Sequence, residues 1–130
     1  MKLVISGSKT IESIGFVNIA MSQPFIIKPT EIVSGTARGV DRVGEIWAEA
    51  NGIPITKMPA DWNKYGKAAG YIRNSEMAEY CDAALVVWNG SSPVSKNMIL
   101  NMKKLCKPEN ITSWNITNKV FCEYFMKDTL

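Results

Sequence analysis

Short apolar runs alternate with longer amphipathic stretches along this chain. The short runs are rich in β-branched residues and predict strands at about 2–6, 30–34, 53–58, 83–88 and 111–114. Apolar positions at helical spacing predict helices at about 11–22, 39–50, 71–80 and 94–105, with a further short helix after residue 118. Strands that alternate with helices at this spacing predict a three-layer α/β/α fold with a mainly parallel sheet of about five strands.

Three glycine-bearing turns follow predicted strands, at residues 7–10, 35–39 and 89–93. The carboxyl ends of parallel strands share one edge of a sheet, and ligands of such sheets bind there. The second turn also leads into a helix near Gly39, whose first N–H groups and dipole suit a phosphate. An ordinary strand-to-helix turn would look the same for any one stretch, so the case for a binding site depends on all three turns.

Composition indicates one globular domain over residues 1–130, with 46% hydrophobic and 21% charged residues. No apolar run approaches the roughly 18 residues of a membrane span, and the first run is too short for a signal peptide, so we expect a cytoplasmic protein. The three cysteines form no C-x-x-C pattern, which favours reduced thiols.

The chain contains no histidine. This excludes Ser-His and Cys-His nucleophile pairs and histidine-bearing zinc sites, and we expect neither a metal nor a cofactor. Any chemistry must come from carboxylates, Arg, Lys, hydroxyls and backbone amides. The net charge of +3 favours an anionic partner only mildly, so nucleic acid is an improbable partner and a membrane is not expected.

Several blocks of residues resemble one family. Its G-S-R-T turn, its S-G-G-A-R-G-V-D signature, its central block and its W-D-G-x-S turn resemble residues 7–10, 34–41, 59–74 and 88–92. The chain is thereby identified as similar to the SLOG superfamily, named for Smf/DprA and LOG proteins, and to its small single-domain YspA-like (YpsA-related) branch in bacteria and phages. The resemblance covers roughly residues 1–105, and the tail from about 107 to 130 is divergent.

The resemblance implies a Rossmann-like fold that binds a nucleotide or nucleotide-derived ligand, such as ADP-ribose or an NAD-related compound. LOG enzymes cleave a nucleotide N-glycosidic bond with an Arg from an R-K-x-x-M-like helix and a Glu from a glycine-rich loop. Arg73 and Met77 fit the first pattern, but Met98 stands where the Glu is expected, and Val94 replaces a flexible turn residue. Methionine cannot act as the carboxylate that such a reaction needs.

The candidate ligand-binding residues come from the three turns and the central block: Gly7, Ser8, Lys9, Ser34, Gly35, Thr36, Arg38, Gly39, Asp41, Asp61, Trp62, Tyr65, Arg73, Asn74, Asn89, Gly90, Ser91 and Ser92. Arg38 and Arg73 suit phosphate, and this role is favoured for both over the alternative of a structural salt bridge to Asp41 or Glu76. Lys9 retains the charge of the family's Arg without its forked geometry.

Three functions remain open at this point. A binding module acting as a sensor, carrier or sequestering protein for a nucleotide-type ligand is favoured. The alternative enzyme would hydrolyse an N-glycosidic or phosphate-ester bond of a nucleotide, with Asp41, Asp61, Glu76 and Arg73 as candidate catalytic residues. Single-stranded nucleic-acid binding, as in DprA, would use Trp62 and Tyr65 for stacking. Relatives pair through helices beside the site, so a homodimer or higher oligomer is a further expectation.

Overall fold

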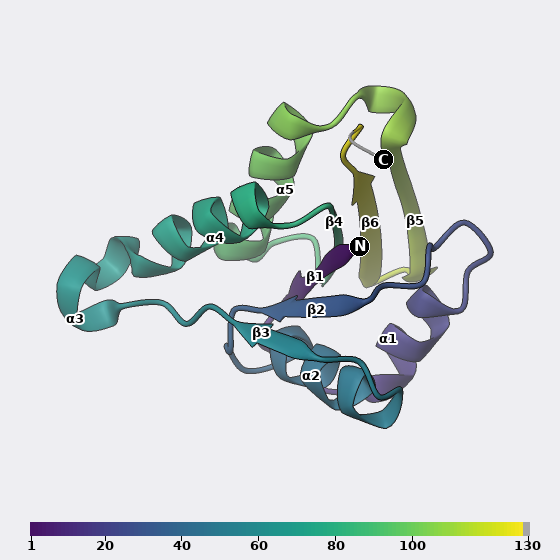
Figure 1. The fold of residues 1–130 in the computed structure, drawn as a ribbon, viewed down its shortest axis with the longest axis horizontal. Coiled ribbons are helices and arrows are strands. Elements are labelled where there is room, and N and C mark those ends of the chain that lie inside the picture. The colour runs from purple at the N-terminus through teal and green to yellow at the C-terminus, as the bar shows by residue number, and fades with distance from the viewer. Residues whose placement is uncertain (129–130) are drawn as a thin grey trace.

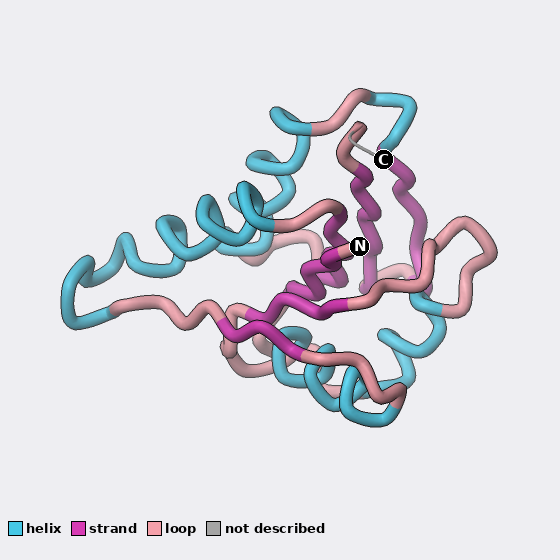
Figure 2. Tube along the Cα trace, in the orientation of Figure 1, coloured by secondary structure: helices cyan, strands magenta, loops and turns pink. Residues whose placement is uncertain are grey.

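A six-stranded sheet lies between two layers of helices in the computed structural model, which describes residues 1–128 (Figures 1 and 2). The strands are β1 (Lys2–Gly7), β2 (Glu31–Ser34), β3 (Ile55–Lys57), β4 (Ala83–Trp88), β5 (Ile111–Thr117) and β6 (Val120–Met126). The helices are α1 (Ile14–Met21), α2 (Val40–Ala50), α3 (Trp62–Tyr65), α4 (Ala69–Tyr80) and α5 (Pro93–Leu105), with the 3-10 turns η1 (Gly66–Ala68) and η2 (Pro108–Asn110). Within this part of the chain, no helix has the length and apolar character to cross a membrane.

The strand order is β3-β2-β1-β4-β6-β5. The first four of these are parallel, but β6 runs antiparallel to β4, and β5 runs antiparallel to β6. The expectation of a mainly parallel sheet of about five strands is therefore wrong, because the sheet is mixed and has six strands. The helix expected after residue 118 is also wrong, since this segment is β6.

The physical reason for β6 is its period of two. Val120, Cys122 and Tyr124 are buried on one face of the sheet, while Phe125 is buried on the other. Asn118 and Lys119 form a tight turn between β5 and β6, and β6 pairs on its other side with β4.

Apolar side chains of alternating strand positions fill two cores, one on each face of the sheet. Leu3 and Ile5 lie in the core that α1 and α2 cover, whereas Val4 and Val86 lie in the core that α4 and α5 cover. Figure 1 shows these two helix pairs on opposite sides of the sheet. Trp47 packs against the first of these cores and Trp88 against the second.

The segment between β3 and α4 contains the short helix α3 and the 3-10 turn η1, which the apolar pattern of the sequence does not predict. Asp61 caps α3 by accepting the Lys64 N–H at 3.1 Å, and η1 then joins α3 to α4, which begins at Ala69 rather than Tyr71. Figure 1 shows α3 and the start of α4 extending away from the sheet. This arm brings Trp62 and Arg73 toward the carboxyl ends of the strands.

Candidate functional site

The turns that follow β1, β2 and β4 are joined to one another through Ser8. The Ser8 carbonyl accepts the N–H of Val40 at 3.2 Å, and its hydroxyl oxygen accepts the N–H of Asn89 at 2.9 Å. Ser8 is buried, so its hydroxyl fastens two turns together instead of facing a ligand. The three glycine-bearing turns thus meet at one edge of the sheet, at the carboxyl ends of its parallel strands.

Gly39 makes this junction sterically feasible. Its φ of +75° lies in the left-handed region, and a Cβ at this position would overlap the carbonyl group of Ser8. Any larger residue would push the start of α2 away from the turn after β1. The glycine therefore fixes where the N-terminus of α2 points.

Arg73 of α4 lies at the base of this edge with only 7% of its surface exposed. Its Nη1 donates to the Gly35 carbonyl at 2.6 Å, and its Nε donates to Asn74 Oδ1 at 3.2 Å. Asn74 is itself held by a 2.9 Å bond to the Val94 carbonyl of α5. The guanidinium is therefore fixed in direction before any ligand arrives, which lowers the entropic cost of binding.

Gly35 is required by this close approach. A Cβ at Gly35 would lie 2.7 Å from both Arg73 Nη1 and Asp41 Oδ2. Arg73 and Asp41 therefore flank the same glycine, although no ion pair joins Arg73 or Arg38 to a carboxylate within residues 1–128. The structural salt bridge considered for these two arginines is not what the structure shows.

Asp41 is almost completely buried, with 3% of its surface exposed, and its Oδ2 accepts the Ala37 N–H at 3.2 Å. Burial raises the pKa of this carboxyl from 3.8 to about 6, against the opposing effect of the Arg73 charge. Burial also lowers the pKa of Arg73, and Asp41 opposes that change, so the guanidinium stays charged.

A second buried carboxylate, Glu45, lies beneath the same turn and was not predicted from the sequence. It accepts the Ser34 hydroxyl at 2.6 Å and forms ion pairs with Arg42 at 3.2 Å and Lys57 at 3.7 Å. Ser34 in turn accepts the Thr36 N–H at 3.1 Å. Glu45 belongs to none of the recognised motifs. The only sequence signal for its role is its position one helical turn after Asp41, on the buried face of α2.

Thr36 has a φ of +65°, a conformation that strains a β-branched residue. The signature that this stretch resembles has glycine here. The side chain of Thr36 is exposed at the edge of the sheet, and strained residues of this kind often mark functional sites.

A cleft of about 430 Å³ opens where these turns meet the arm that carries α3 and α4. The residues lining it are Lys9, Gly35, Thr36, Ala37, Arg38, Pro59, Ala60, Trp62 and Arg73. Three of these side chains are cationic and none is a carboxylate. Trp62 is 55% exposed, and a Cβ on Gly70 would lie 3.6 Å from its indole and 3.8 Å from Arg73 Nη2, so the two groups converge there.

A smaller hollow of about 230 Å³ adjoins this cleft and shares Pro59 and Arg73 with it. Asp61, Tyr65 and Glu76 line this hollow, so the exposed candidate carboxylates lie beside the cationic cleft and not within it.

The remaining predicted residues hold the site in shape. Asn89 Oδ1 accepts the N–H groups of Ser91 and Ser92 at 2.9 and 3.1 Å, and Ser92 Oγ accepts the Ser95 N–H at the start of α5. None of the predicted residues from 89 to 92 lines the cleft. The sequence prediction missed Ala37, Pro59 and Ala60 as cleft residues, although Ala37 lies within the second turn and the other two follow the third strand.

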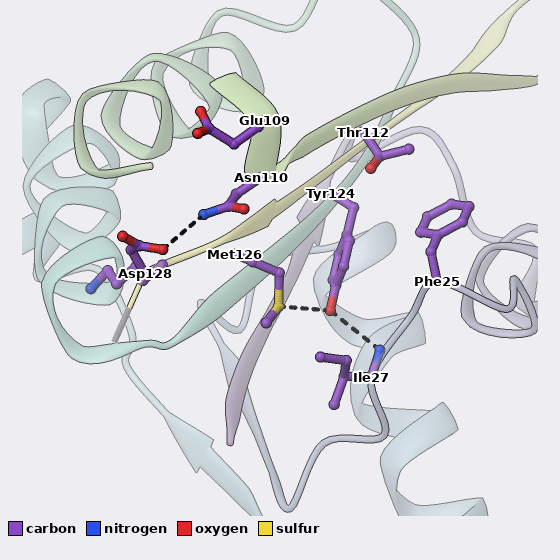
Figure 3. Close-up of a pocket in the computed structure, with 9 residues that line it drawn as sticks. Phe25, Ile27, Glu109, Asn110, Thr112, Tyr124, Met126 and Asp128 are labelled. Carbon is purple, nitrogen blue, oxygen red and sulfur yellow. Dashed lines mark hydrogen bonds between the residues drawn. The ribbon is translucent and has the colours of Figure 1, made fainter. Parts of the chain in front are cut away.

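Another hollow, of about 350 Å³, lies beside the start of β4 at the opposite end of the sheet (Figure 3). Phe25, Tyr124 and Met126 form part of its wall, and the Tyr124 hydroxyl accepts the Ile27 N–H at 3.4 Å and faces Met126 Sδ at 3.0 Å. Its lining contains none of the predicted site residues. Within residues 1–128, no group of three or more acidic or cysteine side chains is placed to hold a metal ion.

A family model described as the YspA, cpYpsA-related SLOG family (YAcAr) matches residues 1–65. The chain belongs to this family. The matched half includes the turns after β1 and β2 and helix α3, which carries Trp62, and membership of an SLOG family indicates a nucleotide-related role. Neither the curated proteins nor the solved structures that were searched contain a match.

Proposed function

We propose that the cleft at the carboxyl ends of β1, β2 and β3 binds a nucleotide or nucleotide-derived ligand through its phosphates. The observation that carries this proposal is the lining of the cleft: Lys9, Arg38 and Arg73 contribute three positive charges, and no carboxylate offsets them there. A volume of about 430 Å³ suits a ligand of nucleotide size. Membership of an SLOG family supports the same ligand class.

Each cation has a different task in this proposal. Arg73 is held rigidly by Gly35 and Asn74, and its Nη2 donates to no group within residues 1–128, so that N–H pair is free for a phosphate oxygen. Lys9 and Arg38 are exposed and can adapt to the ligand. The exposed indole of Trp62 beside them offers a surface on which a base can stack.

The geometry favours binding over cleavage. Met98, which stands where a LOG-like glutamate is expected, is fully buried in the core between α5 and the sheet. No acidic side chain lines the cleft to assist departure of a leaving group. We therefore infer a sensor, carrier or sequestering role for an ADP-ribose-like or NAD-related compound.

The test begins with the purified full chain. Absorbance near 260 nm and mass spectrometry of the released material identify a ligand that co-purifies, and calorimetry measures binding of ADP-ribose, NAD and AMP, with inorganic phosphate for comparison. Lys9→Gln and Arg38→Gln each remove one cleft cation, and each is expected to weaken binding about tenfold. Lys103→Gln, an equivalent change on the exposed face of α5, is the control. If no nucleotide co-purifies or binds, the proposal fails.

A second candidate, hydrolysis of a nucleotide, is favoured by one observation. Asp41 has a pKa of about 6 and flanks the glycine that Arg73 contacts, while Asp61 and Glu76 line the adjoining hollow. A carboxyl with a pKa near neutrality can exchange protons readily. Chromatography of AMP, NAD and ADP-ribose incubated with the protein would reveal turnover. Turnover that Asp41→Asn, Asp61→Asn and Glu76→Gln all leave unchanged would exclude these three groups as catalysts.

A further inference from the structure

The hairpin of β5 and β6 ends the sheet in an open edge. β5 pairs with β6 on one side only, and its residues from Ile111 to Asn115 pair in unbroken register with those from Phe125 to Phe121. The irregularity in the pairing is confined to the end beside the turn, between Asn115 and Thr117. The outer backbone groups of this regular stretch are therefore available to another strand.

β5 lacks the features that usually protect such an edge. Its sequence, Ile-Thr-Ser-Trp-Asn-Ile-Thr, contains no charged residue, no proline and no glycine. The opposite edge of the sheet differs, because β3 has only three residues and ends in the exposed Lys57. The two edges are thus unequal, and only β5 is suited to pairing.

Exposed apolar side chains lie beside this edge. Phe25 and Ile27, from the segment between α1 and β2, are 39% and 49% exposed. The Phe25 ring meets Trp114 of β5 edge-on, with ring centroids 4.9 Å apart. Figure 3 shows Phe25 and Ile27 bordering the hollow whose lining includes Thr112 of β5. A partner that paired with β5 would also meet this apolar surface.

We propose that two copies of this chain associate through β5, pairing antiparallel about a two-fold axis that passes beside Ser113, the middle residue of the regular stretch. This arrangement joins the two six-stranded sheets into one continuous sheet. The axis is perpendicular to the sheet, so Phe25 and Ile27 of both copies lie on the same face, near the new junction. The interface is isologous, the commonest kind in homodimers.

The distribution of charge along and beside β5 indicates that its partner is a second copy of this chain. In a symmetric antiparallel pair, side chains of β5 face side chains of an identical strand, and a charged strand would oppose like charges. β5 is uncharged and avoids this repulsion. The arrangement also brings the turn of one copy, which carries Lys119, beside the η2 end of the other. At that end Lys107 is paired with Asp128 at 2.6 Å, and Glu109 leaves a net negative charge that complements Lys119.

The first experiment measures the mass of the full chain by light scattering and sedimentation equilibrium over a range of concentrations. We expect a reversible dimer, and we expect Ser113→Lys to raise the dissociation constant. The substitution replaces the hydroxyl that donates to Glu123 with a long side chain, and it places two positive charges opposite each other at the axis, each with a Glu123 beside it. Ser75→Lys, the same substitution at an exposed position of α4, is the matched control. Circular dichroism checks that both variants fold.

The second experiment tests the register. Residues directly opposite each other in an antiparallel pair have Cβ atoms about 4.5–5.5 Å apart, within reach of a disulfide, so oxidised Ser113→Cys should run as a dimer on a non-reducing gel. Asn115→Cys should not, because the two substituted positions would lie about 14 Å apart along the strands. The native cysteines are buried and remain unlinked. A monomer at every concentration, a dimer indifferent to Ser113→Lys, or equal cross-linking of both cysteine variants would overturn the proposal.

Discussion

The buried carboxyl of Asp41 gives the sharpest prediction about stability. Its pKa rises from 3.8 to about 6 in the folded chain, so the folded state holds the proton more tightly than the unfolded state. The stabilisation is fully present below pH 3.8 and is lost as the pH rises through about 6. Each pKa unit corresponds to about 1.4 kcal/mol, so the total loss is about 3 kcal/mol.

Asp41→Asn removes this titration while leaving an amide oxygen to accept the Ala37 N–H. Relative to the wild type, the variant should therefore gain about 3 kcal/mol of unfolding free energy between pH 3.8 and a pH above 6. Urea denaturation at a series of pH values measures this difference, and taking the difference between the two proteins cancels the titration of other groups.

Asp61→Asn is the matched control, since Asp61 is exposed and asparagine caps a helix about as well as aspartate. Its stability difference from the wild type is measured over the same pH range, and the gain of Asp41→Asn should exceed any change that this control shows. A constant difference for Asp41→Asn would refute the reasoning, because it would mean that the folded chain does not hold the Asp41 proton more tightly than the unfolded chain.

Three further predictions concern the site and the thiols. Gly35→Ala places a Cβ 2.7 Å from Arg73 Nη1, so it should lower the unfolding free energy by about 1–3 kcal/mol and weaken nucleotide binding. Urea denaturation measures the first effect and calorimetry the second. An unchanged affinity would contradict the role of Arg73 in binding. Thr36→Gly removes the backbone strain of a β-branched residue at φ +65° and should raise the unfolding free energy by up to about 1 kcal/mol. A clear loss of stability would show instead that the threonine side chain holds the turn. Burial raises the pKa of Cys81 to about 11 and that of Cys122 to about 12. Ellman's reagent should therefore label neither thiol rapidly in the native protein at neutral pH. A rapid labelling phase that persists in a variant lacking Cys106 would contradict this prediction.

The sequence predicts the four parallel strands and the helices between them, because their apolar periodicity is strong. β4 is found over Ala83–Trp88, where the uninterrupted run Ala-Ala-Leu-Val-Val-Trp predicts it, and α2 begins directly after Gly39. The hairpin could not be predicted with the same certainty. Glu123 interrupts the apolar run of β6, and the strand character of β6 becomes apparent only when one face packs against the α1–α2 core and the other against the α4–α5 core.

The candidate site was predictable as a place, but the task of each residue was not. Arg38 and Arg73 were singled out for their chemistry, and the structure brings both to one cleft. Ser8, Asp41 and Asn74 come from the same motifs, yet they lie buried as parts of the scaffold. A motif records that residues are needed together, and it does not distinguish those that face the ligand from those that hold them.

What the sequence determined by itself is local: apolar periodicity set most of the helices and strands, since it depends on neighbours a few residues away. Only the tertiary structure decided that Arg73 reaches across 38 residues to the Gly35 carbonyl, that Asp41 is cut off from water, and that β5 forms an open edge. These outcomes depend on which surfaces come together when the sheet forms. Contacts between residues far apart in the sequence produce no repeating pattern of apolar and polar positions from which they could be predicted.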